Sequence, residues 1–305
     1  MTTIEAARVR ELSIVSEDGV RLAVTERGPR DASHTVVLLH GFCLSKTSWE
    51  PHAEELARLW GDDIRVITYD HRGHGLSAAA DMGTYTVPQL ARDLSSVLRW
   101  SNPRGSVTLA GHSMGGMTIL EYLGMSDRSV EPTNVLLVAT AAGKLPLRGM
   151  GRALALPAVA FLHANVGRVP DRVLDPILRA LTEPVVSRIV RHVAYTEDGG
   201  KASATAAAWS INATPMRTKI GFLDALKRFD AYETLPRISA DTLILSGGKD
   251  FLTPKAHSDD MQWLIPNAEH IHYPRNGHMI LHEEFSATIN ALNLFVSDYS
   301  HAHAV

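Results

Sequence analysis

The chain has 305 residues, 45% of them hydrophobic and 21% charged, with a formal net charge of −3 at pH 7, which is ordinary globular composition for one large domain with an insertion. The mild acidity predicts no nucleic-acid partner, and the single cysteine, Cys43, excludes a disulfide within the chain. The longest apolar run, 153–162, is far shorter than the roughly 20 residues that cross a bilayer, so we expect no stable membrane insertion and a cytoplasmic location.

Strand and helix patterns alternate over the N-terminal half of the chain. Apolar runs and period-two alternation predict strands at 9–16, 20–26, 35–39, 64–69, 107–110 and 134–139. Helical spacing follows three of them, at 49–60, 87–100 and 114–124. The first two strands flank a Glu17-Asp18-Gly19 turn and predict a β-hairpin. The later strand–helix alternation predicts a mostly parallel sheet.

Strand patterns stop for about a hundred residues and then resume. The later elements are a strand at 242–245, a helix at 256–264, a strand at 270–273 and a last helix from 283 to 298. Helical patterns fill the gap, at 169–181, 185–193, 203–212 and 218–229. We therefore predict an α/β fold with a central sheet of about eight strands and helices on both faces. Residues 1–141 and 233–305 form its core, and 142–232 form an inserted helical cap.

The segment Gly111-His112-Ser113-Met114-Gly115 joins a predicted strand to a predicted helix. A sharp turn there exposes the serine, and the two glycines avoid clashes between Cβ atoms. The following helix N-terminus offers free N–H groups and a positive dipole end. These features suit a nucleophile that develops an oxyanion, so we predict Ser113 as the catalytic nucleophile.

A serine hydroxyl needs a general base, and the base needs an acid that orients it. His278 follows the last predicted strand and is the predicted base, with His282, one helical turn later, as the alternative. Asp250 follows the strand at 242–245 and is the predicted acid. Asp241 begins that strand and is expected at the opposite end of the sheet.

An oxyanion hole needs two N–H donors that point at one position. The Met114 N–H, directly after the nucleophile, is one predicted donor. The second is expected from the loop His40-Gly41-Phe42-Cys43, and we predict the Phe42 N–H. Cys43 itself is predicted as a small buried core residue, with a thiol-sensitive gate as the alternative.

With these motifs in place, the chain resembles the α/β-hydrolase superfamily, in its serine-nucleophile, capped, carboxylesterase and lipase-like branch. The chain order Ser113, Asp250, His278 matches the family order, and residues 40–42 resemble the family's oxyanion loop. Residues 70–75, Asp-His-Arg-Gly-His-Gly, resemble its DxRGxG turn, which implies a structural role. A serine nucleophile argues against the epoxide hydrolases and haloalkane dehalogenases of this family, which use aspartate.

The resemblance implies hydrolysis of carboxylic esters of small to medium apolar substrates through an acyl-enzyme, with no metal or organic cofactor. Apolar residues beside the triad and in the cap are expected to bind the substrate: Leu44, Phe161, Trp209, Phe251 and Met279. A thioesterase, a lactonase, a C–C bond hydrolase and a haloperoxidase-like perhydrolase are alternatives on the same triad. A non-catalytic ligand receptor is a remote alternative, and the oligomeric state is left open.

Two of these alternatives depend on particular residues. A C–C bond hydrolase must bind a carboxylated substrate, for which Arg148, Arg152 and Arg217 in or beside the cap are candidates. A receptor on this fold would be expected to have lost a triad member, and all three residue types are present here.

Overall fold

The computed structural model describes residues 9–166, 176 and 210–302. In this part of the chain, one eight-stranded sheet has the order β1-β2-β4-β3-β5-β6-β7-β8. Its strands are β1 Val9–Val15, β2 Arg21–Arg27, β3 His34–Leu39, β4 Ile64–Tyr69, β5 Ser106–His112, β6 Asn134–Val138, β7 Asp241–Gly247 and β8 Ala268–Tyr273. The β1–β2 and β2–β4 pairs are antiparallel and all other neighbours are parallel. The predicted fold class is confirmed.

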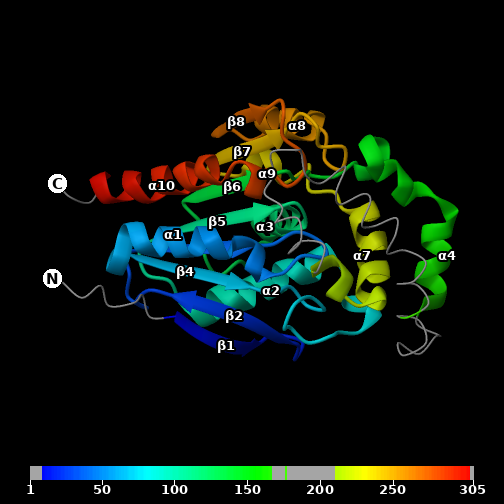
Figure 1. Cartoon of the computed structure of the whole chain (residues 1–305), viewed down its shortest axis with the longest axis horizontal. Coiled ribbons are helices and arrows are strands. Elements are labelled where there is room, and N and C mark those ends of the chain that lie inside the picture. Colours follow the sequence, from blue (N-terminus) through cyan, green and yellow to red (C-terminus); the bar gives the residue numbers. More distant parts are fainter. Residues whose placement is uncertain (1–8, 167–175, 177–209, 303–305) are drawn as a thin grey trace.

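Helices cover both faces of this sheet (Figure 1). The longer core helices are α1 Glu50–Trp60, α2 Val87–Ser101, α3 Met114–Gly124, α8 Ala256–Leu264 and α10 Phe285–Ala302. Adjacent residues of β3 belong to different cores: Val37 packs in the cluster that includes α2 and α3, and Val36 in the cluster with α1 and α10. Successive strand side chains point to opposite faces, which is why a buried central strand must be apolar throughout.

Short 3₁₀ helices and one short α-helix occupy several of the connections. They are η1 Lys46–Trp49, η2 Gly61–Asp63, η3 Met82–Thr84, η7 Leu235–Arg237 and α9 Ile280–Glu283. The prediction of one continuous last helix over 283–298 was wrong in one detail. The helix breaks at Glu284, whose φ of −119° and ψ of 51° are not helical, and it continues as α10.

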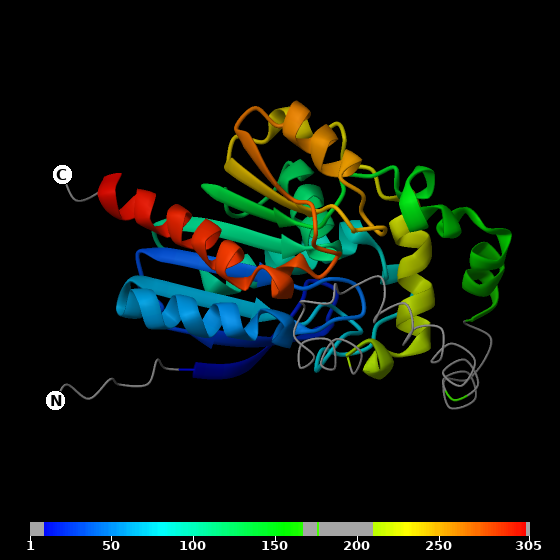
Figure 2. The ribbon, with the colours of Figure 1, turned by 45° about the horizontal axis from the view of Figure 1, so that its top comes forward.

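The described residues between β6 and β7 contain helices and no strand. They include η4 Leu145–Leu147, η5 Gly149–Ala155, α4 Pro157–Val166 and α7 Met216–Arg228, and η7 follows before β7. Figure 2 shows α4 and α7 beyond the carboxyl ends of the parallel strands. The helices predicted at 169–181 and 185–193 lie outside the described residues apart from residue 176, and the one at 203–212 is described only from residue 210. The cap boundaries at 142 and 232 remain predictions. None of the described helices is long and apolar enough to cross a membrane.

Candidate active site

Ser113 lies at the turn between β5 and α3 in an unusual backbone conformation. Its φ of 51° and ψ of −117° fall in a region that L-residues rarely adopt. Two hydrogen bonds hold it there: its N–H donates to the Val138 carbonyl at 2.9 Å, and its carbonyl accepts from Thr140 Oγ1 at 2.6 Å. The neighbouring strand β6 therefore supports the turn that carries the hydroxyl.

The two glycines of the motif are required by close backbone approaches. A Cβ at Gly111 would lie 2.5 Å from the Gly115 carbonyl carbon. A Cβ at Gly115 would lie 2.3 Å from the Leu39 carbonyl oxygen at the end of β3. Both distances are shorter than real Cβ contacts, so this turn excludes side chains at both positions.

The structure brings the three predicted catalytic residues together. Ser113 Oγ lies 3.0 Å from His278 Nε2, and His278 Nδ1 lies 2.8 Å from Asp250 Oδ2. They follow β5, β8 and β7, and the carboxyl ends of parallel strands meet at one edge of the sheet. Asp241 begins β7 at the other edge and is exposed. His282 Nε2 lies 3.0 Å from the Ser48 carbonyl oxygen, so His278, not His282, contacts the serine.

Thr253, which the sequence analysis did not identify, holds the acid in place. Thr253 Oγ1 donates to Asp250 Oδ2 at 2.6 Å, and the N–H groups of Leu252 and Thr253 donate to Oδ1 at 2.8 and 2.9 Å. Burial alone would raise the pKa of Asp250, but His278 and Thr253 outweigh it and hold that pKa below its ordinary value. The carboxylate is therefore ionised and oriented. The Asp-x-x-Thr spacing of an aspartate-initiated turn is the signal that could have identified Thr253.

The two predicted oxyanion donors belong to segments that contact each other. A Cβ at Gly41 would lie 3.2 Å from Ser113 Cβ, so the loop at 40–44 packs directly against the turn. Phe42 follows Gly41, and Met114 follows Ser113 at the first position of α3. Within the described residues, neither the Phe42 nor the Met114 N–H has a hydrogen-bond acceptor. Two free backbone donors beside a serine are what an oxyanion hole requires.

Buried, neutral histidines fix the oxyanion loop to the turn after β4. His74 Nε2 accepts the Cys43 N–H at 3.1 Å, and its Nδ1 lies 3.0 Å from the Arg72 carbonyl oxygen. His40 Nε2 accepts the His71 N–H at 2.9 Å. Burial lowers the pKa of His40 to about 4 and of His74 to about 3. Because both stay neutral, each keeps the lone pair that accepts these N–H groups.

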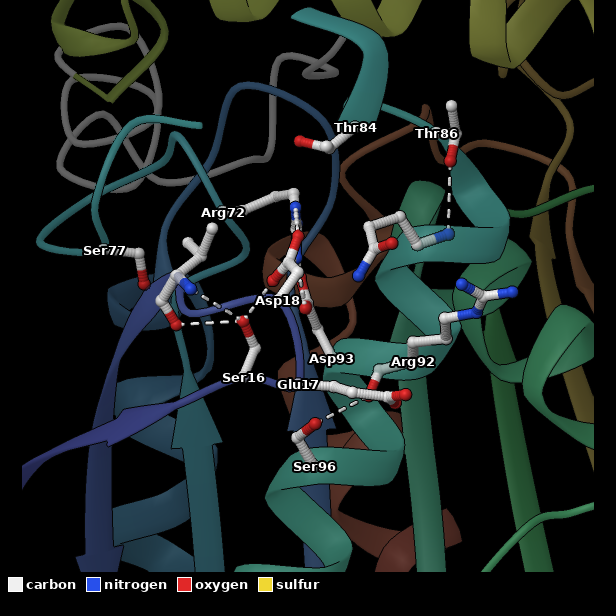
Figure 3. A network of polar contacts seen from close by, with 12 residues as sticks. Ser16, Glu17, Asp18, Arg72, Ser77, Thr84, Thr86, Arg92, Asp93 and Ser96 are labelled. Carbon is white, nitrogen blue, oxygen red and sulfur yellow. Dashed lines mark hydrogen bonds and ion pairs between the residues drawn. The ribbon is translucent and has the colours of Figure 1, made fainter. Parts of the chain in front are cut away.

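Arg72 anchors the same turn to the rest of the core (Figure 3). Its guanidinium is fully buried and donates to both carboxylate oxygens of Asp93 on α2, at 2.7 and 2.6 Å. It also donates to both oxygens of Asp18, in the β1–β2 turn, at 2.7 and 3.0 Å. This ion-pair network agrees with a structural role for residues 70–75.

Cys43 is a buried member of the loop at 40–44. Its side chain is 6% exposed, and burial raises the pKa of its thiol to about 12. The thiol is therefore protonated near neutral pH and a poor nucleophile. This environment fits a small core residue better than a thiol-sensitive gate.

The predicted substrate-binding residues are dispersed. Leu44 and Met279 are buried, whereas Phe251 is 54% exposed and Phe161, on α4, is 69% exposed. Trp209 lies outside the described residues. The proposed contacts of these five side chains with substrate remain predictions.

The arginines considered for a carboxylated substrate can be placed in part. Arg148 forms an ion pair with Asp260 at 2.9 Å and donates to the Ala256 carbonyl at 2.8 Å. Arg152 Nε donates to the Leu147 carbonyl at 3.2 Å. These three contacts hold the guanidinium groups of Arg148 and Arg152 on protein atoms. Arg217 lies on α7 and is half-buried.

Comparison with known proteins identifies the family of the chain. The family model described as "alpha/beta hydrolase fold" matches residues 34–285, so the chain belongs to the α/β-hydrolase family. It is similar to the proline iminopeptidase PfmaB of Pestalotiopsis fici, with 26% identity over 87% of this chain and 95% of that protein. It is also similar to the sn-1-specific diacylglycerol lipase ABHD11 of Mus musculus, with 26% identity over 86% and 80% of the two chains.

Among solved structures, the fold is shared with an esterase (EaEST) from Exiguobacterium antarcticum. The TM-score is 0.77 at 21% identity, covering 94% of this chain and all of the other. Family membership and fold together define the protein as a hydrolase. The relatives' names cover peptide and lipid substrates, so they do not determine which bond this enzyme cleaves.

Proposed function

We propose that this hydrolase cleaves carboxylic esters of small to medium apolar substrates through an acyl-enzyme. The observation that carries the proposal is the continuous hydrogen-bonded series Ser113 Oγ, His278 and Asp250, with spacings of 3.0 and 2.8 Å. The strained turn at Ser113 and the two free N–H groups beside it support the same chemistry.

In the proposed first step, Ser113 Oγ attacks the ester carbonyl carbon while His278 Nε2 takes the hydroxyl proton. Asp250 accepts the hydrogen bond from His278 Nδ1–H and stabilises the imidazolium. The Phe42 and Met114 N–H groups bind the oxyanion of the tetrahedral intermediate. As the intermediate collapses, the bond to the alcohol oxygen breaks, and His278 gives its proton to that oxygen.

The second step regenerates the enzyme. Water attacks the acyl carbonyl carbon as His278 Nε2 removes one of its protons. The second tetrahedral intermediate expels Ser113 Oγ, which recovers that proton from His278, and the carboxylic acid leaves. Every proton is returned within the triad, so the cycle needs no co-reactant other than water.

The choice of an oxygen ester rests on the lipase among the relatives and on the apolar residues that flank the triad in sequence. Thioesters, lactones, C–C bonds and peroxyacid chemistry use the same triad and stay open as substrates. The ion pair between Arg148 and Asp260 reduces the case for a carboxylate-binding C–C hydrolase. We also propose the cytoplasm as its compartment, because a chain with a single cysteine forms no internal disulfide, as is usual in reducing compartments.

Hydrolysis of p-nitrophenyl esters from acetate to palmitate tests the proposal. Activity with a chain-length optimum, abolished in Ser113→Ala and kept in the exposed-serine control Ser286→Ala, would support it. No ester hydrolysis by an enzyme whose Ser113 still reacts with a fluorophosphonate would overturn the substrate class while retaining the nucleophile. Loss of both would overturn the triad.

A further inference from the structure

We propose that His112 is a positioning residue that holds the backbone of His278 at the distance proton transfer requires. This inference rests on the proposed function. His112 is the last residue of β5, directly before Ser113, and its side chain is 1% exposed. Its Nε2 lies 3.0 Å from the His278 carbonyl oxygen, and the two ring centroids are 5.1 Å apart.

The direction of this hydrogen bond follows from its partners. A carbonyl oxygen can only accept, so His112 Nε2 carries the proton. Burial lowers the pKa of His112 to about 3, so the ring is neutral and Nδ1 holds a lone pair. Among the described residues Nδ1 has no hydrogen-bond partner, and a Cβ at Gly41 would lie 2.8 Å from it. The ring therefore fills the space between the oxyanion loop and the His278 segment.

The backbone of the segment that carries His278 is anchored mainly at the residues on either side of it. It lies between β8 and α9, outside any regular element. The Gly277 N–H donates to Glu283 at 2.7 Å, and the Asn276 carbonyl accepts from the Lys249 N–H at 2.9 Å. At His278 itself, within the described residues, His112 is the side chain that fixes the backbone carbonyl.

His112 thus connects the base to the nucleophile through one side chain. Ser113 follows it in the chain, and His278 accepts its hydrogen bond across the site. A shift of about 1 Å in the His278 segment would carry the bond between Ser113 Oγ and Nε2 beyond hydrogen-bond distance. In the sequence alone, His112 stands out only as a member of the Gly111–Gly115 segment.

Two amide substitutions separate the hydrogen bond from burial. In His112→Gln the amide nitrogen can reach the position of Nε2, whereas in His112→Asn it is too short to reach the His278 carbonyl. We expect His112→Asn to lower kcat about 30-fold with KM within about twofold, and His112→Gln to recover most of that loss. Equal kcat in the two variants and the parent would overturn the proposal, as would equal losses in both. Thermal unfolding checks that both variants fold.

A double-mutant cycle with His278→Ala tests whether His112 acts through His278. The readouts are ester hydrolysis and the rate at which a fluorophosphonate labels Ser113. We expect His112→Asn to slow labelling about 30-fold in the parent and less than twofold in His278→Ala. The same fold-loss in both backgrounds would show that His112 acts elsewhere, for example on the oxyanion loop, and would overturn the proposal.

The labelling rate also separates this inference from the substrate proposal. If ester hydrolysis fails in the parent but labelling proceeds and depends on His278, the substrate class is wrong and the role of His112 is still decided by the cycle. If His278→Ala labels as fast as the parent, the base is misassigned and the role of His112 falls with it.

Discussion

At Ser113 the backbone adopts φ 51°, a conformation that glycine adopts at lower energy, although the proposed chemistry requires a hydroxyl. Local strain of this kind costs on the order of 1–3 kcal/mol and is held by surrounding contacts. Here those contacts are the bonds to Val138 and Thr140. The core thus stabilises a conformation that exposes the proposed nucleophile.

This strain predicts a difference in the free energy of unfolding between two variants of Ser113. Ser113→Gly relieves the unfavourable φ but gains chain entropy in the unfolded state, whereas Ser113→Ala keeps the strain. We expect Ser113→Gly to exceed Ser113→Ala by about 1 kcal/mol in the free energy of unfolding. Urea unfolding measures the difference. An alanine variant as stable as the glycine variant would show that the turn is not strained.

Thr253 gives a second prediction at this scale. Thr253→Val keeps the shape of the side chain but removes the 2.6 Å bond to Asp250 Oδ2. A hydrogen bond to a charged group contributes about 1.5–3 kcal/mol, so we expect kcat to fall roughly tenfold or more. Thr253→Ser, which retains the hydroxyl, is the matched control. Normal kcat in the valine variant would contradict a positioning role.

At the scale of elements, the packing of α3 against β3 places Ser113 over the end of the sheet. This close packing depends on Gly115, which has no Cβ. A Cβ at that position would lie only 2.3 Å from the Leu39 carbonyl oxygen. Since that obstacle is backbone, it cannot rotate away as a side chain could. The packing of α3 against β3 therefore holds the turn at Ser113 close to the loop at 40–44.

We expect Gly115→Ala to lower the free energy of unfolding by about 2 kcal/mol or more and to impair catalysis, because α3 must move away from β3. Gly83→Ala is the matched control, since a Cβ there meets nothing within 4 Å. Denaturant unfolding and initial rates of ester hydrolysis compare the two. A stable, active Gly115→Ala would contradict the close packing.

At the scale of the whole molecule, Arg72 joins the N-terminal hairpin, the turn after β4 and helix α2. Arg72 and Asp93 are fully buried, whereas Asp18 is partly exposed. Removing one member of a buried pair leaves an uncompensated charge, which is strongly destabilising. The network therefore couples the first strands of the chain to the turn after β4. That turn carries His74, which in turn contacts the loop at 40–44.

The same network predicts an acid-dependent loss of stability. The hydrogen bond from Arg72 is the main cause that lowers the pKa of Asp18 from 3.8 to about 2. A depressed pKa stabilises the folded state above pH 3.8, and this contribution disappears as pH falls through about 2. We expect Asp18→Asn to cost about 1 kcal/mol at pH 7, allowing for solvent screening. Urea unfolding between pH 7 and 3 measures the difference in free energy of unfolding between the parent protein and Asp18→Asn. We expect this difference to shrink below pH 4. A difference that stays constant would contradict the ion pair between Asp18 and Arg72.

Most of the fold and the grouping of Ser113, His278 and Asp250 could be predicted because local patterns encode them. Period-two alternation, helical spacing and the Gly-x-Ser-x-Gly turn act within a few residues, and each predicted strand outside the cap appears in the sheet. Ser113, Asp250 and His278 follow three different strands of the sheet, β5, β7 and β8. Parallel strands bring their carboxyl ends together, so sequence position alone placed these residues near each other.

Local patterns in the chain were therefore enough to predict the α/β class, the strands that precede Ser113, Asp250 and His278, and the loop expected to bind the oxyanion. Long-range packing sets three further features: His278 rather than His282 contacts Ser113, Thr253 holds Asp250, and His112 contacts the His278 carbonyl 166 residues away. The reason is physical: periodicity reports which face of an element is buried. A hydrogen bond depends on the positions of atoms to a few tenths of an ångström, which long-range packing sets.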